Sequence, residues 1–319
     1  MQRWARPLLL AALLAPTAAL ADHSFILPSN TNVSGTNTMV TFDAAGSEHV
    51  FFFDHRPIQL AAIRIWKPDG TPGESVNGVQ GRFRSVFDVK LDQPGTWKVA
   101  AEQKMITGSF KLNGEERRVG GRGGAPRAGQ PGPGGPGQPG EARPASGQRG
   151  SEGGEPRGPG GARGPGEGGA RRMPPVAFED IPAEATDVHL TEIANRVETF
   201  VTLGAPTTTI FKPTGKGMEL EPVTHPNAIA AGETARFRFL IDGKPAAGLK
   251  VTVVPGGDRY REDVGTIELA TGADGVVAVT WPHAGMYWLG AEATDDNPSE
   301  KRAEARRMSY AATFEVMTP

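Results

Sequence analysis

The first residues that could do chemistry are Asp22 and His23, which directly follow a segment with the features of an export signal. If the chain is cut after Ala21, the mature protein begins with a free amine followed at once by an imidazole. The amine, the backbone nitrogen of His23 and its imidazole can then lie in one plane around an ion. Such a set favours nickel or copper over zinc, which prefers a tetrahedron. The alternative is that His23 only begins a strand over residues 24–27.

Residues 1–21 have the three parts of a signal peptide. Arg3 and Arg6 precede an apolar run over residues 8–14, and Ala-Leu-Ala at 19–21 provides a cleavage site. The run is too short to span a bilayer, and no later segment reaches the roughly 20 apolar residues needed. We therefore expect a periplasmic protein whose mature chain has no integral membrane segment.

A second cluster contains His49 and His55, on either side of an aromatic run. If residues 50–54 form a strand, these two histidines lie roughly 20 Å apart and cannot bind one ion together. We favour His55 as the partner of His23, because it follows an aspartate at the end of the expected strand. The predicted metal site therefore consists of Asp22, His23 and His55. His49 is predicted to lie at a solvent-exposed end of an aromatic strand.

The other histidines, at 189, 225 and 283, have no ligand-like neighbours nearby and are expected in turns or at the surface.

Signatures of nucleophilic, nucleotide-binding and zinc-protease enzymes are missing, so we expect a non-enzyme without an organic cofactor. The acidic residues of segment 258–263 could form an acid/base pair, but a solvated, salt-bridged loop explains them better.

Composition narrows the chemistry further. The 319-residue chain has no cysteine, which excludes a thiolate nucleophile, a zinc knuckle and an iron–sulfur cluster. The formal charge of −2 becomes −4 without the leader, because the leader carries two arginines and no acid. This balance argues against nucleic acid as a partner.

Turn signals and short apolar segments indicate an all-β protein of two antiparallel β-sandwich domains. We place the first domain at 22–212 and the second at 213–319. The first contains a Gly/Pro/Arg-rich insertion at 114–175, which is predicted to be disordered because it lacks the apolar side chains needed for a core. After it, a hairpin is expected around Ala194 and Asn195.

Several segments resemble a known family. They are His-Ser-Phe-Ile-Leu-Pro-Ser at 23–29, Phe-Asp-His at 53–55, Gly-Met-Glu-Leu-Glu-Pro-Val-Thr-His-Pro at 217–226 and Asp-Gly-Lys-Pro at 242–245. They are similar to an exported bacterial family of unknown function that is grouped with the periplasmic component of nickel and cobalt uptake systems. The resemblance covers nearly the whole mature chain except the insertion.

This resemblance implies two immunoglobulin-like domains, the second similar to carboxypeptidase-regulatory modules. It also implies that the processed first residue and the next histidine hold a nickel or cobalt ion, which supports Asp22, His23 and His55. Uptake components that join a transporter carry transmembrane helices and begin with Met, whereas no such helices are expected in this chain and its first mature residue would be Asp22.

The leading hypothesis is therefore a periplasmic metal-binding accessory protein for nickel or cobalt uptake. Its partners would be a metal-uptake transporter or an outer-membrane receptor. The alternative is a non-enzymatic interaction or adhesion module that binds protein or glycan without metal. Its support is the insertion and the aromatic side chains and Gly-Pro turns of the second domain.

Overall fold

The computed structural model describes residues 23–120 and 174–319, and within them the fold is built from β-strands and short 3₁₀ turns. The predicted all-β sandwich architecture is confirmed. The leader, Asp22 and most of the predicted insertion lie outside the described residues. Among the residues described, no helix is long and apolar enough to cross a membrane.

The strands form three sheets. The first contains β1 (His23–Pro28), β3 (Thr38–Ser47), β4 (Arg56–Pro57), β6 (Ser75–Gln80) and β7 (Ser85–Leu91). The second contains β2 (Asn32–Val33), β5 (Ile63–Trp66), β8 (Gly95–Leu112), β9 (Glu115–Val119), β10 (Thr186–Leu203), β14 (Lys250–Pro255), β15 (Ile267–Ala270), β17 (Gly285–Asp295) and β18 (Ala305–Val316). The third contains β11 (Met218–Pro222), β12 (Thr234–Ile241), β13 (Lys244–Pro245) and β16 (Val276–Thr280). The 3₁₀ turns are η1 (Leu60–Ala62), η2 (Phe178–Asp180), η3 (Thr209–Phe211) and η4 (Asp258–Tyr260).

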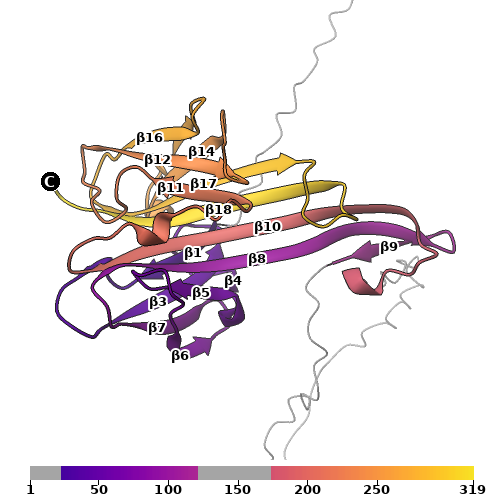
Figure 1. Ribbon diagram of the computed structural model, residues 1–319, viewed down its shortest axis with the longest axis horizontal. Coiled ribbons are helices and arrows are strands. Elements are labelled where there is room, and N and C mark those ends of the chain that lie inside the picture. Colours follow the sequence, from indigo (N-terminus) through magenta and orange to yellow (C-terminus); the bar gives the residue numbers. More distant parts are fainter. Residues whose placement is uncertain (1–22, 121–173) are drawn as a thin grey trace, which may run out of the picture. The chain divides into compact units, whose positions relative to one another are not determined.

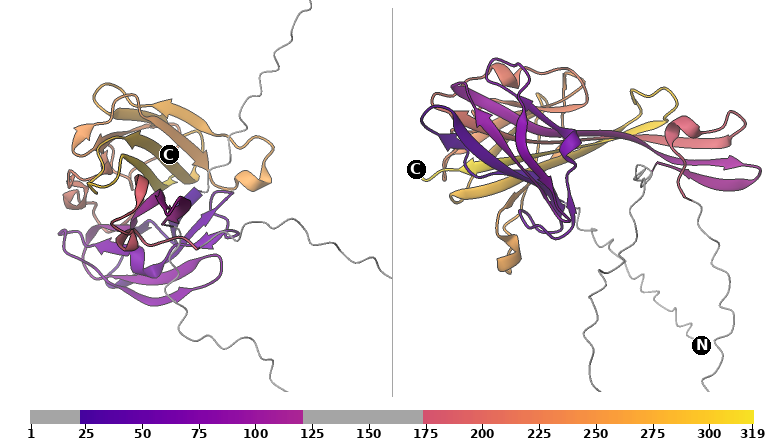
Figure 2. Two further views of the ribbon diagram at one scale, coloured as in Figure 1. Left: turned by 90° about the vertical axis from the view of Figure 1, so that its right-hand side faces the viewer. Right: turned by 90° about the horizontal axis from the view of Figure 1, so that it is seen from below.

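Two hydrophobic cores form on opposite sides of the second sheet. In Figure 1 the N-terminal strands lie on one side of β10 and β18 and the strands of the third sheet on the other, and the left view of Figure 2 shows the same separation. Alternation along β18 explains this, since Tyr310 and Ala312 belong to one core and Ala311 to the other.

Contacts divide the chain into two compact units, residues 1–106 with 190–319, and residues 107–189. The first contains both cores. In the second, the end of β8 pairs with β9 and Lys111 forms an ion pair with Asp187 at 2.9 Å. The domain boundary at 212 and 213 stays a prediction.

The expected hairpin around Ala194 and Asn195 is wrong. Both residues lie inside the continuous strand β10, which pairs in parallel with β18 through Ala194–Met308 and Asn195–Ser309. The Ser309 hydroxyl also donates to the Asn195 side-chain oxygen at 2.8 Å. A partner strand more than 100 residues away therefore outweighs the local turn preference.

The expected strand at 50–54 is also wrong, since these residues form a turn. Phe51 has a φ of 64°, in the left-handed region that bulky residues rarely adopt. Its ring packs edge-on against Phe25, with centroids 5.2 Å apart. A side chain on Gly256 would lie 2.9 Å from this ring, so the glycine makes room for the turn. The 20 Å separation of His49 and His55 does not hold, because it assumed an extended strand.

Candidate functional site

His23 lies at the head of β1, opposite Ser47 in the last position of β3. Its ring Nδ1 is 3.1 Å from the carbonyl oxygen of Glu48, which can only accept, so Nδ1 carries the proton. The ring also meets Trp288 edge-on, with centroids 4.6 Å apart and planes at 88°. The imidazole is therefore held from two sides at the edge of the sheet.

Trp288 also binds the backbone next to His23. Its indole Nε1–H donates to the carbonyl oxygen of Ser24 at 3.0 Å. The indole lies across Gly290, where an added Cβ would come within 2.0 Å of the ring. We call His23, Ser24, Glu48, Trp288 and Gly290 the N-terminal cluster.

The other predicted ligands are placed differently. Asp22 lies outside the described residues. His55 is exposed and directly precedes Arg56 of β4. Arg56 pairs with Gly46 of β3, and β4 lies on the opposite side of β3 from β1. Two strand spacings, roughly 10 Å, therefore separate the backbones at His55 and His23. Within residues 23–120 and 174–319, no three His, Asp or Glu side chains are grouped to hold a metal ion.

His49 has a partner that the sequence did not reveal. Its Nδ1 lies 3.3 Å from Oδ2 of Asp258, a carboxylate that is only 5% exposed. Asp258 also accepts from the backbone N–H of Val50 at 3.3 Å and of Arg259 at 2.8 Å. The expectation of a fully solvated loop at 258–263 is therefore wrong for Asp258. A buried carboxylate that orients one imidazole nitrogen is a common outer partner of a metal-binding histidine.

His225 begins a turn, one of the two placements expected for it, but its ring is only partly exposed and has several partners. Its Nε2 lies 3.0 Å from the Thr96 hydroxyl and 3.2 Å from the Thr207 carbonyl oxygen, and the Asn227 N–H donates to its Nδ1 at 3.1 Å. This arrangement suits a neutral ring. Burial lowers the pKa of His225, although the hydrogen bond to Thr207 opposes the shift.

The depressed pKa predicts a pH dependence of stability. Because the unfolded imidazole titrates near 6.5, the contribution of His225 is complete above that pH and is lost as the pH falls below it. The difference in melting temperature between the wild type and His225→Gln should shrink from about pH 8 to about pH 5. His283→Gln, at an exposed position, serves as the control. Parallel melting curves for the wild type and His225→Gln would contradict this assignment.

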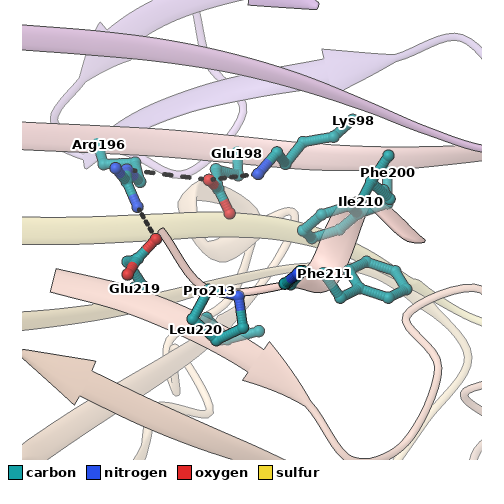
Figure 3. A pocket seen from close by; sticks show the side chains of 10 residues that line it. Lys98, Arg196, Glu198, Phe200, Ile210, Phe211, Pro213, Glu219 and Leu220 are labelled. Atoms are coloured by element: carbon teal, nitrogen blue, oxygen red, sulfur yellow. Dashed lines mark ion pairs between the residues drawn. The ribbon is translucent and has the colours of Figure 1, made fainter. Parts of the chain in front are cut away.

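Several charged side chains lie around Arg196 (Figure 3). Its guanidinium lies 3.2 Å from Glu102, 3.3 Å from Glu219 and 3.9 Å from Glu198. Glu198 also accepts the hydroxyl of Tyr310 at 2.8 Å. Burial raises the pKa of Tyr310 well above its usual value, and the Glu198 charge adds to the shift. The pocket beside Arg196, Glu198 and Glu219 has a volume of about 10 Å³, about the space of one water molecule. We therefore expect the cluster to matter for folding stability.

A groove of about 630 Å³ lies elsewhere in the same unit. Phe51, Met286 and Tyr287 supply part of its apolar wall, and Arg261 and Asp263 are its charged residues. The loop that forms one side also carries Tyr260, which is 80% exposed and packs edge-on against Phe52. The groove is large enough for a small ligand or a side chain of a partner.

Comparison with known proteins finds one family model that matches most of the chain. Residues 19–295 match the model of a domain of unknown function, DUF4198. No curated protein matches the chain.

Three solved structures are similar at a low level. The Salmonella alpha-2-macroglobulin reacted with methylamine is 11% identical, with 91% of this chain and 14% of that one covered and a TM-score of 0.20. The D0-D1 domain of Intimin is 12% identical, with 92% and 97% covered and a TM-score of 0.20. The Escherichia coli alpha-2-macroglobulin activated by porcine elastase is 11% identical, with 93% and 31% covered and a TM-score of 0.19. This chain thus spans less than a third of each macroglobulin.

Proposed function

This chain belongs to the DUF4198 family, whose function is unknown, and we propose that it is a periplasmic metal-binding protein that serves nickel or cobalt uptake. The ion would bind at the N-terminus that remains after cleavage following Ala21. Its ligands would be the amine of Asp22, the backbone nitrogen of His23 and the imidazole of His23. A metal-uptake transporter or an outer-membrane receptor would be the partner.

The observation that supports this proposal most is the placement of His23. Its ring is positioned by Glu48 and Trp288 instead of projecting freely into solvent. Chelation together with the backbone nitrogen of the same residue requires Nδ1, because only that ring atom is close enough to its own backbone. Loading would therefore exchange the hydrogen bond with Glu48, a net loss of about 1 kcal/mol, for a bond to the ion.

Protons compete with the metal ion for the ligand nitrogens, so the pH determines whether the proposed site holds or releases the ion. The amine, amide and imidazole nitrogens must all lose protons before they bind the ion. Mildly acidic conditions would therefore release nickel. This property suits a carrier that passes its ion to a second protein.

A further histidine would complete the plane of nitrogens. His55 is the residue predicted from the sequence, whereas His49 immediately follows Glu48, whose carbonyl binds His23. His49 is also oriented by Asp258. Both histidines are therefore tested side by side.

Titration calorimetry of the processed protein with nickel chloride tests the proposal. His23→Ala should weaken nickel binding more than the ~10- to 100-fold typical for the loss of an outer partner. Of His49→Ala and His55→Ala, only the variant that removes a ligand should weaken binding, and His283→Ala serves as a matched control. Unchanged nickel affinity in His23→Ala would refute the proposal.

The second candidate function is a non-enzymatic interaction module. The exposed ring of Tyr260 and the groove beside it favour this alternative, since exposed aromatic residues are frequent in binding surfaces. A partner captured equally well with and without a chelator, and lost on Tyr260→Ala but not on His23→Ala, would favour interaction over metal binding.

A further inference from the structure

Trp288 makes two contacts with the first two described residues of the chain. The indole nitrogen donates to the Ser24 carbonyl oxygen at 3.0 Å, and the centroids of the indole and the His23 imidazole lie 4.6 Å apart with the ring planes at 88°. The two partners are more than 260 residues away along the chain. One side chain therefore holds both the backbone and the ring at the head of β1.

Gly290 allows this placement of the indole. Both residues lie on β17, and a Cβ at position 290 would come 2.0 Å from Cη2, 2.5 Å from Cζ2 and 2.7 Å from Cζ3 of Trp288. Contacts below 3 Å with three atoms of a rigid ring cannot be relieved by a small rotation. The φ of Gly290 is not in the left-handed region, so the space taken by the indole is what requires glycine here.

The surroundings of His23 explain why it needs such a support. β1 pairs with β3 through His23–Ser47, at the first position of β1 and the last of β3, where fraying is easiest. A chelate needs three nitrogens at fixed positions, and each freely rotating group that must be ordered reduces the affinity. An indole that binds the Ser24 carbonyl and packs against the imidazole removes part of this cost before the ion arrives.

We propose that Trp288 is a positioning residue, which, with room provided by Gly290, fixes the head of β1 and the His23 imidazole for metal binding. This inference rests on the proposed function for its metal-binding part. The placement of His23 can be measured without metal, and the two ideas can therefore fail separately.

The first arm uses the metal-free processed protein. An imidazole edge-on to an indole has shifted ring-proton resonances, and a held strand exchanges its amide hydrogens slowly. Trp288→Phe keeps a ring and loses the donor, and Gly290→Ala keeps the tryptophan and pushes it away. Both should move the His23 ring resonances and speed amide exchange at residues 24–26. Trp66→Phe, at another half-buried tryptophan, should change neither. Unchanged His23 resonances and exchange in both test variants would overturn the inference.

The second arm adds nickel chloride. Trp288→Phe and Gly290→Ala should each weaken nickel binding by about 10-fold, as expected for the loss of an outer partner. Quenching of tryptophan fluorescence by nickel should be largely lost in Trp288→Phe and kept in Trp66→Phe. Melting temperatures would show that each variant is folded.

The outcomes separate the two proposals. If nickel binds the wild type and Trp288→Phe equally tightly, Trp288 does not position the chelate, and the inference is overturned. If nickel does not bind the wild type, the proposed function is refuted, and the metal-free arm still decides whether Trp288 holds His23.

Discussion

Acetylation of the Asp22 amine in the processed protein is expected to weaken nickel binding by more than about 100-fold. An acetylated nitrogen is an amide, which binds the ion only after it loses its remaining proton, so the His23 imidazole would lose the readily deprotonated amine that anchors the chelate. This effect should exceed the ~10- to 100-fold loss caused by removal of an outer partner, because a direct ligand is removed. Calorimetry with nickel chloride measures the change, after mass spectrometry has confirmed that the chain begins at Asp22.

Extension of the N-terminus by one residue provides a second test of whether the terminal amine binds the ion. A glycine before Asp22 moves the amine one residue further from His23 and places a second backbone nitrogen between them. The number of nitrogens that can enter the plane changes, so both the affinity and the visible absorption of the nickel complex should change. Equal affinities for the processed, acetylated and extended proteins would show that the terminus does not bind the ion.

The general architecture could be predicted because it follows from local patterns. Alternation in segments such as 85–91 and turn signals such as Asp242-Gly243 predict short strands and tight turns, and both occur in the structure. The parallel pairing of β10 with β18 could not be predicted, because it joins residues more than 100 positions apart. Local preference instead suggested a turn at 194–195, inside that strand.

Prediction of the candidate site from the sequence is limited in the same way. A histidine at the head of the first strand was expected from the sequence, and His23 lies there. Its contact with Trp288 and the pair of His49 with Asp258 depend on tertiary packing across more than 200 residues. The only local signal was the Gly256-Gly257 pair before Asp258, which marks a tight turn and does not identify its partner.

The second large expected effect is a loss of folding stability when Arg196, in the buried charge cluster, is replaced. Arg196→Met keeps the length of the side chain and removes the charge that faces Glu198 and Glu219, which are 3% and 6% exposed. Loss of one partner from a buried ion cluster typically costs about 3–5 kcal/mol, because the remaining charges are left uncompensated. Against a total stability of about 5–15 kcal/mol this is a large part. Because Glu198 keeps Lys98 at 3.8 Å and the Tyr310 hydroxyl, we expect about 3 kcal/mol.

Urea unfolding at neutral pH measures this loss, and Arg307→Met provides the matched control. Arg307 pairs with Glu292 at 3.1 Å, but both side chains are more than half exposed, so their pair should contribute at most about 1 kcal/mol. A cost for Arg196→Met no larger than that for Arg307→Met would show that the cluster does not depend on its guanidinium. The triple variant Arg196→Met with Glu198→Gln and Glu219→Gln should recover part of the stability, because it removes the two buried carboxylates that Arg196→Met leaves without their guanidinium.

The pH dependence of Arg196→Met distinguishes lost charge compensation from lost packing. Burial alone would raise the pKa of Glu219, but hydrogen bonds from Thr214 and Gly215 and the Arg196 charge hold it below its usual 4.5. A lowered folded-state pKa contributes stability above the unfolded value, and this contribution is lost as the pH falls through the folded value. Removal of Arg196 raises the Glu219 pKa, so the stability gap between the variant and the wild type should narrow as the pH falls to and below about 4.5, through the lowered folded-state pKa of Glu219. A gap that stays constant over this range would assign the loss to packing of the arginine stem.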